Sequence, residues 1–411
     1  MTKNKTYIII GGGQAGGEAA ITLRAAGFEG QIIVVGEEKL VPYERPPLSK
    51  TYLTDETMER AEFRPLQAYL DARADCRLGV RATGLDAARK LLTLEDGSEL
   101  HWDKLLLATG GTPRKLPHAN GPVYYLRTEE DALALRGAIR SADRVVVVGG
   151  GVIGMETAAS ARQLGAEVLV VEPADRVMAR MVPAEISRLI EQMHRDHQVE
   201  LRLNSGVQAV EETAGGRALV HLDDGTLEAD LVIVGIGIEP NTQLAVEAGL
   251  EVDNGIVVNS SCQTSHPDIY AAGDVANTEL ARYGQHIRVE SWLNASKQAE
   301  AAARAMCGEA VVYDELPWFW SDQYDVNLQV AGLPHLANET LFRGGQDLAQ
   351  GVTAVHLRDN ELIAVTTLNN GKDMSAARRM LARGITPDLN ALCDPSVPLK
   401  KLLKAAATAT A

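Results

Sequence analysis

Tyr7-Ile8-Ile9-Ile10 runs directly into Gly11-Gly12-Gly13-Gln14-Ala15-Gly16, and this stretch decides the fold. A short apolar run that ends in a glycine-rich loop predicts a buried strand followed by a tight turn. We expect a helix of small residues at 18–26 and a second strand at 31–35, which completes a β-α-β unit. The first glycine of such a loop permits the turn, the second lets backbone approach a pyrophosphate, and the third allows close helix packing.

The same order of elements recurs in the middle of the chain. A strand at 144–148 leads into Gly149-Gly150-Gly151-Val152-Ile153-Gly154, and we expect a helix at 155–164 and a strand at 167–171. One G-x-G-x-x-G loop is weak evidence, because glycine-rich turns also occur for packing reasons. Two copies, each inside a complete β-α-β unit, predict two dinucleotide sites with the anion held at a helix N-terminus.

An acidic ribose ligand is expected about 20 residues after each loop begins. Glu172 closes the second strand of the second unit, where a carboxylate accepts bonds from ribose hydroxyls and repels a 2′-phosphate, so NADH is preferred over NADPH. In the first unit the strand ends at Gly36, with Glu37 and Glu38 beyond it. Glu37 is our choice there, with a solvated loop charge as the alternative.

Two arginines oppose the preference for NADH. Arg176 and Arg180 follow Glu172 closely, and their guanidinium groups offer a site for the 2′-phosphate of NADPH. The alternative is a basic loop beside acidic neighbours.

Three further segments read as sheet strands that end in glycine, at 105–111, 231–237 and 269–275. From Pro317 onward the pattern changes to short strands and a basic helix around 376–383, which indicates a separate domain. His194 and His197 lie three apart in a predicted helix, and we interpret them as a solvated helix end rather than a metal site.

Composition restricts the class of protein. The 411 residues are 45% apolar and 23% charged, which excludes global disorder, and the net charge of −15 has the wrong sign for general nucleic-acid or anionic-membrane binding. The four cysteines are far apart in sequence, which predicts buried thiols in a reducing compartment and neither a dithiol nor a metal cluster. Without a signal segment or a long apolar stretch, we expect a cytoplasmic protein.

Several segments besides the glycine loops carry a family resemblance. They are Tyr43-Glu44-Arg45-Pro46-Pro47-Leu48-Ser49-Lys50, Ala108-Thr109-Gly110, Gly273-Asp274, Val289-Glu290-Ser291-Trp292-Leu293-Asn294 and Pro317-Trp318-Phe319-Trp320-Ser321-Asp322-Gln323. Essentially from end to end, the chain resembles the FAD-containing, NADH-dependent ferredoxin reductases of bacterial oxygenase systems. This family includes the reductases of phenylpropionate, biphenyl and toluene dioxygenases and putidaredoxin reductase.

The resemblance implies an α/β fold like that of glutathione reductase, with two Rossmann-like domains and a C-terminal α+β domain. FAD would bind to 1–112 together with 245–323, and NAD to 113–244, with the C-terminal domain at 324–411. It also implies that NADH gives hydride to FAD, and that electrons pass singly to a two-iron ferredoxin that supplies a ring-hydroxylating oxygenase of aromatic-compound degradation. The protein would be a monomer or weak dimer.

The resemblance also implies residue roles. Lys50 would lie beside flavin N5 and pair with Glu156, a carboxylate that limits the cost of burying the lysine charge. Trp320 would cover one face of the isoalloxazine, and Trp292 would lie near the flavin and the iron–sulfur partner. The other residues assigned to cofactor binding are Gly11, Gly13, Gln14, Ala15, Gly16, Glu37, Arg45, Ala108, Thr109, Gly110, Gly149, Gly151, Val152, Ile153, Gly154, Glu172, Arg180, Gly237, Gly273 and Asp274.

Other functions remain open on the same scaffold. A disulfide reductase is disfavoured, because the cysteines are unpaired in sequence and no histidine follows His356. A rubredoxin reductase or an NADH oxidase would differ in acceptor, and a flavin redox sensor resembling apoptosis-inducing factor would turn over slowly. Between 372 and 404 the chain has seven basic and three acidic residues, which either steer an acidic ferredoxin or form an ordinary charged helix face.

Overall fold

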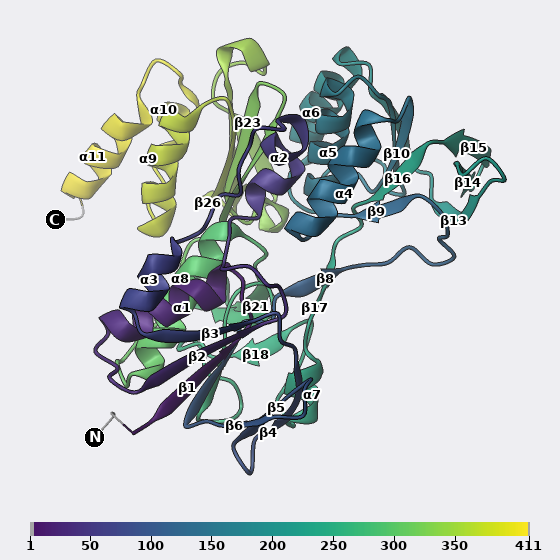
Figure 1. Cartoon of the computed structure of the whole chain (residues 1–411). Helices are drawn as coiled ribbons and strands as arrows, with labels where there is room; N and C mark the ends of the chain where they lie inside the picture. Colours follow the sequence, from purple (N-terminus) through teal and green to yellow (C-terminus); the bar gives the residue numbers. More distant parts are fainter. Residues whose placement is uncertain (1–3, 410–411) are drawn as a thin grey trace. The chain divides into compact units, whose positions relative to one another are not determined.

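The computed structural model describes residues 4–409 of the chain, which form two compact units, each built from three stretches (Figure 1). The first unit takes the residues up to Glu44, then Arg60–Thr112 and Ile238–Pro317. The second takes Arg45–Glu59, Pro113–Gly237 and the residues from Trp318 onward. Each glycine loop of the sequence therefore lies in a unit of its own.

A five-stranded parallel sheet forms the centre of the first unit, in the order β19-β7-β1-β2-β3. Successive side chains of a strand point to opposite faces of the sheet, and each face is covered by its own hydrophobic core cluster. In β1, Tyr7 and Ile9 lie in the first core cluster, and Ile8 and Ile10 lie in the second. The strands are β1 (Thr6–Ile10), β2 (Gln31–Gly36), β3 (Ala74–Leu78), β7 (Lys104–Leu107) and β19 (Ile269–Ala271).

Two helices cover one face of this sheet, and two small three-stranded sheets, one antiparallel and one mixed, pack on the other. Figure 1 shows α1 (Gln14–Ala25) beside α8 (Trp292–Met306), and the alanines of both helices fill the first core cluster. The small side chains permit this close approach of the two helices. The unit also contains α3 (Leu66–Asp71), β4 (Ala82–Asp86), β5 (Leu91–Leu94), β6 (Glu99–His101), β17 (Ile238–Pro240), α7 (Gln243–Glu247), β18 (Ile256–Val258), β20 (Ala276–Leu280) and β21 (Gln285–Arg288), and β8 (Gly111–Pro113) pairs with β17.

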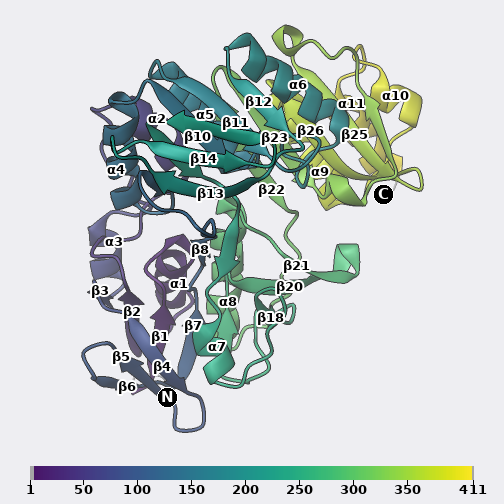
Figure 2. The same cartoon turned by 90° about the vertical axis from the view of Figure 1, so that its right-hand side faces the viewer.

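The second unit contains another five-stranded parallel sheet, in the order β12-β11-β10-β16-β9. A three-stranded antiparallel sheet packs on one face, where its valines join those of β10 and β11 in one core (Figure 2). The elements are α2 (Thr51–Thr54), β9 (Val123–Tyr125), α4 (Glu129–Arg140), β10 (Arg144–Val148), α5 (Val152–Gln163), β11 (Glu167–Glu172), α6 (Ala184–Asp196), β12 (Glu200–Leu203), β13 (Val207–Glu212), β14 (Ala218–Leu222), β15 (Gly225–Ala229) and β16 (Leu231–Val234).

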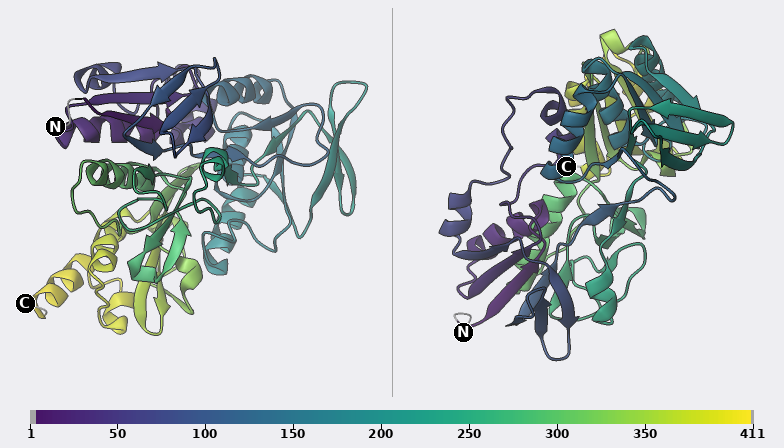
Figure 3. Two further views of the ribbon diagram at one scale, coloured as in Figure 1. Left: turned by 90° about the horizontal axis from the view of Figure 1, so that it is seen from below. Right: turned by 45° about the vertical axis from the view of Figure 1, so that its right-hand side comes forward.

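A five-stranded antiparallel sheet completes the second unit, in the order β22-β23-β26-β25-β24. It begins at Trp318, because β22 pairs along its whole length with β23, whereas the sequence placed the start of the C-terminal domain after Gln323. The C-terminal helices, yellow in Figure 3, lie together beside this sheet. The elements are β22 (Trp318–Gln323), β23 (Val326–Gly332), β24 (Glu339–Phe342), β25 (Val352–Arg358), β26 (Glu361–Leu368), α9 (Gly371–Ala382), α10 (Leu389–Cys393) and α11 (Leu399–Ala409).

Predicted elements occur in the predicted order, with ends that differ by a few residues. The glycine-loop helices begin earlier than expected, at Gln14 and Val152, because the loop residues already form the first helical turn. The strands predicted at 105–111, 231–237 and 269–275 end sooner, at Leu107, Val234 and Ala271. The positive φ angles of the glycines that follow, such as 83° at Gly273, take the backbone out of the strand.

Candidate functional site

The first glycine loop forms an uncapped helix N-terminus at the carboxyl end of β1. A Cβ atom placed on Gly16 would lie 1.9 Å from the carbonyl oxygen of Gly11, so only glycine allows this approach of helix and strand. No side chain caps α1 at Gly13, whereas α8 in the same unit is capped by the hydroxyl of Ser291. The free N–H groups and the helix dipole of α1 therefore suit a phosphate.

Two other segments of the predicted site meet this loop at the carboxyl edge of the sheet. A Cβ on Gly11 would lie 2.0 Å from the carbonyl oxygen of Ala108, and one on Gly273 would lie 3.1 Å from the Cβ of Ala15. The structure thus brings 11–16, 108–110 and 273–274 together, although they are far apart in sequence. This edge is where nucleotides bind in open α/β sheets.

Three side chains hold these loops in place, and two of them, Gln298 and Asn241, were not selected from the sequence. Gln298, fully buried on α8, accepts a hydrogen bond of 2.8 Å from the backbone N–H of Gly273. Asn241 donates to the carbonyl of Thr109 at 2.9 Å. Gln14 joins the first turns of α1 and α8 through a bond of 2.8 Å to the carbonyl oxygen of Trp292.

Two further residues are predicted to bind FAD, Glu37 and Arg45, and the side chain of each has a partner in the structure. The side chain of Glu37 is 65% exposed just after β2 and forms an ion pair with Arg81. Arg45 belongs to the second unit, where its guanidinium donates to the carbonyl oxygen of Arg127 at 2.6 Å.

The second glycine loop repeats this geometry in the second unit. A Cβ on Gly154 would lie 1.9 Å from the carbonyl oxygen of Gly149, and no side chain caps α5 at Gly151. Glu172 ends β11 beside the loop and accepts two backbone hydrogen bonds, from Gly150 at 2.6 Å and from Ala174 at 2.8 Å. These bonds fix the carboxylate at the carboxyl edge of the sheet, where a ribose ligand of this fold belongs.

The two arginines after Glu172 have different surroundings. Arg176 donates to the carbonyls of Val182 and Ala179 at 2.7 and 2.8 Å, and so closes its own loop. Arg180 is exposed, and its guanidinium lies 3.5 Å from the Cβ position of Gly237, at the carboxyl edge of the same sheet.

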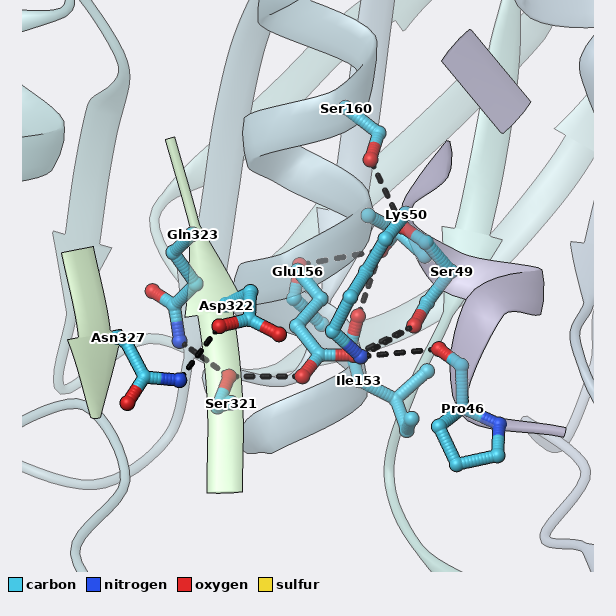
Figure 4. A network of polar contacts seen from close by, with 12 residues as sticks. Pro46, Ser49, Lys50, Ile153, Glu156, Ser160, Ser321, Asp322, Gln323 and Asn327 are labelled. Carbon is cyan, nitrogen blue, oxygen red and sulfur yellow. Dashed lines mark hydrogen bonds and ion pairs between the residues drawn. The ribbon is translucent and has the colours of Figure 1, made fainter. Parts of the chain in front are cut away.

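A buried ion pair joins the segment after the Pro-Pro turn to α5. The ammonium of Lys50 lies 2.7 Å from the carboxylate of Glu156, and the Glu156 side chain is 1% exposed (Figure 4). Lys50 also donates to the carbonyl oxygen of Pro46 at 3.0 Å, and the hydroxyl of Ser321 donates to Glu156 at 2.7 Å. Ser49 adds another hydroxyl donor to the same carboxylate. The pairing predicted for Lys50 and Glu156 is present, with two serine donors that sequence reasoning missed.

The aromatic residues of β22 form a stacked group. The rings of Trp318 and Trp320 lie 5.2 Å apart, and the guanidinium of Arg378 on α9 lies 4.6 Å from the centre of the Trp318 ring. Trp292 lies in the other unit, at the first turn of α8, with its ring edge-to-face against Phe63.

The interpretation of His194 as part of a solvated helix end is wrong. His194 is fully buried on α6 and shares a hydrogen bond of 2.9 Å with the amide of Gln323. Burial lowers the pKa of His194 to about 4. Its spacing of four from Ile190 on the apolar face of the helix was the signal for burial. Among residues 4–409 no group of three or more His, Cys, Asp or Glu side chains is placed to hold a metal.

Comparison with known proteins decides the family. The pyridine nucleotide-disulphide oxidoreductase family matches residues 5–299, and the reductase C-terminal family matches 318–403. The chain belongs to the pyridine nucleotide-disulphide oxidoreductases. It is 40% identical to the ferredoxin–NAD(+) reductase component of the anthranilate 1,2-dioxygenase system of Burkholderia cepacia, over 97% of this chain and 99% of that protein.

Other relatives are of the same kind. Putidaredoxin reductase of Pseudomonas putida is 39% identical over 99% of this chain and 98% of its own. A solved structure of putidaredoxin reductase in covalent complex with putidaredoxin aligns with a TM-score of 0.94 at 37% identity, covering 98% of this chain and 99% of that one. The chain is thus an oxidoreductase that uses FAD and NAD(H), and the fold predicted from the sequence is confirmed.

Despite the family's name, the thiols here are not arranged for disulfide chemistry. Cys76, Cys262, Cys307 and Cys393 are all free. Burial raises the pKa of each thiol, and that of Cys262 reaches about 12. A thiol with a raised pKa is a poor nucleophile, because the thiolate is the reactive form. Within the described part of the chain, no helix is long and apolar enough to cross a bilayer.

Proposed function

We propose that this oxidoreductase passes electrons from NADH through FAD to a two-iron ferredoxin, which supplies a ring-hydroxylating oxygenase of aromatic-compound degradation. The observation that carries the proposal is the pair of uncapped glycine-loop helices, one in each unit, in a chain whose full-length relatives are ferredoxin reductases. One dinucleotide site would serve a simple dehydrogenase, whereas two serve a relay between nucleotides. When bound, FAD takes up a hydride and gives up its electrons one at a time.

We assign FAD to the loop of the first unit and NADH to that of the second. In the first, the N-terminus of α1 would hold the pyrophosphate, and Asp274 would accept a bond from a ribityl hydroxyl at the end of β19. In the second, Glu172 would accept bonds from the ribose hydroxyls and repel a 2′-phosphate, which favours NADH. Arg180 would contact a nucleotide phosphate at the same edge.

For Lys50 we propose the role that the family resemblance implies, a cation beside the flavin ring. The buried pair with Glu156 supports this role, because an ionised partner lowers the cost of keeping an ammonium out of water. Three acceptors around Lys50, from Glu156, Pro46 and Ser49, hold the ammonium in one orientation. For Trp320 we propose that the ring shields the flavin from solvent, with Trp318 stacked behind it.

The ferredoxin would dock on the basic C-terminal segment. Lys372, Arg379 and Arg383 on or next to α9 are exposed, as are Lys400 and Lys401 on α11, on a chain whose net charge is −15. A local positive surface on an acidic protein steers an acidic partner toward one face. Free thiols throughout the chain agree with work in a reducing compartment, and we propose the cytoplasm.

A rapid-mixing experiment tests the proposal. The FAD-loaded protein is reduced anaerobically with one equivalent of NADH and mixed with an oxidised two-iron ferredoxin, and the flavin spectrum is followed. We expect fast reoxidation that slows as salt increases, because the steering is electrostatic. Lys400→Glu with Lys401→Glu should slow the same step, and Lys115→Glu is the matched control on an exposed lysine outside the segment. Flavin that stays reduced with ferredoxin present would contradict the proposal.

A further inference from the structure

The hydrogen bonds of Glu156 continue away from Lys50 through a line of buried side chains. Ser321 donates to Glu156 at 2.7 Å, Gln323 donates to Ser321 at 3.0 Å, and the ring Nε2 of His194 lies 2.9 Å from the amide oxygen of Gln323. Figure 4 shows Ser321 between the amide of Gln323 and the carboxylate of Glu156. All of these side chains are at most 2% exposed, so water does not compete for their bonds.

The chemistry of these groups fixes which of them donates and which accepts in each hydrogen bond of the line from His194 to Glu156. An ionised carboxylate only accepts hydrogen bonds, so the single proton of the Ser321 hydroxyl points at Glu156. The hydroxyl oxygen must then accept from Gln323, which turns the NH₂ group toward Ser321 and the amide oxygen toward His194. The amide oxygen needs a donor, and therefore Nε2 of His194 carries the proton.

The other ring nitrogen of His194 agrees with this assignment. Nδ1 is buried and has no hydrogen-bond partner among the described residues, as suits a nitrogen that carries a lone pair rather than an N–H. The ring is neutral at pH 7, because burial lowers its pKa to about 4. The opposite tautomer would reverse the amide of Gln323, which would draw the Ser321 proton away from Glu156.

We infer that His194, Gln323 and Ser321 are positioning residues that act in series to hold the Glu156 carboxylate for Lys50. Ser321 occupies one carboxylate oxygen, Oε1, so that the other, Oε2, is left for Lys50 and Ser49. Without the Ser321 bond, the carboxylate is held by Ser49 and Lys50 at Oε2 alone, so its orientation and that of the Lys50 ammonium are less fixed. The inference rests on the proposed function, in which Lys50 acts beside the flavin.

Two substitutions at one position separate this role from simple packing. Ser321→Ala removes the hydroxyl, and Ser321→Thr keeps a hydroxyl on the same strand. In the FAD-loaded protein we expect Ser321→Ala to slow NADH-dependent flavin reduction about tenfold, the effect of losing one hydrogen bond to a charged group. Ser321→Thr should restore the rate to within about threefold of the wild type, and the flavin midpoint potential should shift in the alanine variant alone.

The tautomer of His194 gives a readout that needs neither flavin nor NADH. In ¹⁵N-labelled protein at pH 7, the ring nitrogens of His194 should report an Nε2–H tautomer, with His194→Gln used to assign the signal. An Nδ1–H tautomer would overturn the inference, and so would Ser321→Ala protein with the wild-type flavin reduction rate and potential. By contrast, protein that binds FAD but is not reduced by NADH would contradict the proposed function and leave the tautomer result standing.

Discussion

Acid should destabilise the protein through two buried histidines as the pH falls from 6.5 to 4. Burial lowers the pKa of His194 and of His356 from an ordinary 6.5 to about 4. His356 lies fully buried on β25 between the hydroxyls of Thr340 and Thr366, at 3.1 and 2.8 Å. Next to His194 lie the rings of His197 and Tyr324, and neither supplies a negative charge at neutral pH that would stabilise the protonated ring.

The sign follows from which state binds the proton. Above pH 6.5 both histidines are neutral in the folded and the unfolded chain. Between pH 6.5 and 4 the unfolded chain binds a proton at each histidine and the folded chain does not, so the free energy of unfolding falls. The lost stability is about 3.5 kcal/mol per histidine, from a pKa difference of roughly 2.5 at about 1.4 kcal/mol per pKa unit. Below pH 4 this loss is complete.

Urea-induced unfolding at a series of pH values between 7 and 4 measures this loss. His356→Gln keeps a neutral polar group and should remove about half of the histidine-dependent slope, whereas the exposed His101→Gln should leave the slope unchanged. Burial raises the pKa of Glu44, so its protonation stabilises the folded protein as the pH falls and partly offsets the loss from the histidines. This contribution is the same in all the variants, and the slopes are therefore compared between variants. Equal slopes in His356→Gln and the wild type would refute the reasoning.

Three further predictions test the assigned sites. Gly16→Ala should abolish FAD binding, whereas Gly154→Ala should leave FAD bound and raise the KM for NADH. In each variant the new Cβ would lie 1.9 Å from a carbonyl oxygen of its own glycine loop. Flavin absorbance at 450 nm and steady-state kinetics with NADH measure the two effects. Glu172→Ala should lower the ratio of kcat/KM for NADH to kcat/KM for NADPH about tenfold, because one charge-assisted hydrogen bond is lost. An unchanged ratio would contradict the assignment of Glu172 as the ribose ligand. Arg343→Ala should destabilise the protein by about 3–5 kcal/mol in urea unfolding, because the buried Arg343 guanidinium pairs with Asp373 at 3.0 Å and donates to the carbonyl oxygens of Leu392 and Asp394. A loss below about 1 kcal/mol would contradict this.

The parts of the fold that depend on local pattern could be predicted from sequence. Both glycine loops, their strands and the acidic end of β11 follow from apolar runs, from glycines that the turns require and from a fixed spacing. The ends of helices were less predictable, because residues such as Gln14 and Val152 suit either a loop or a first helical turn.

The side chains that support the site were not predictable from local pattern. Ser321 and His194 are distant in sequence from Glu156, and their contacts depend on β22 packing against α5 and α6. A serine and a histidine give no signal of burial by themselves, and only the helical spacing of His194 from Ile190 hinted at it. The ion pair of Glu37 was not predictable either, because its partner Arg81 lies 44 positions later in the chain.

The most direct test of the account is NADH-driven reduction of cytochrome c by the purified, FAD-loaded protein, with and without a two-iron ferredoxin, while peroxide is recorded. The account predicts a large increase in cytochrome c reduction when ferredoxin is added, with little peroxide formed. Equal NADH consumption in both reactions, with stoichiometric peroxide, would contradict it and would identify oxygen as the acceptor.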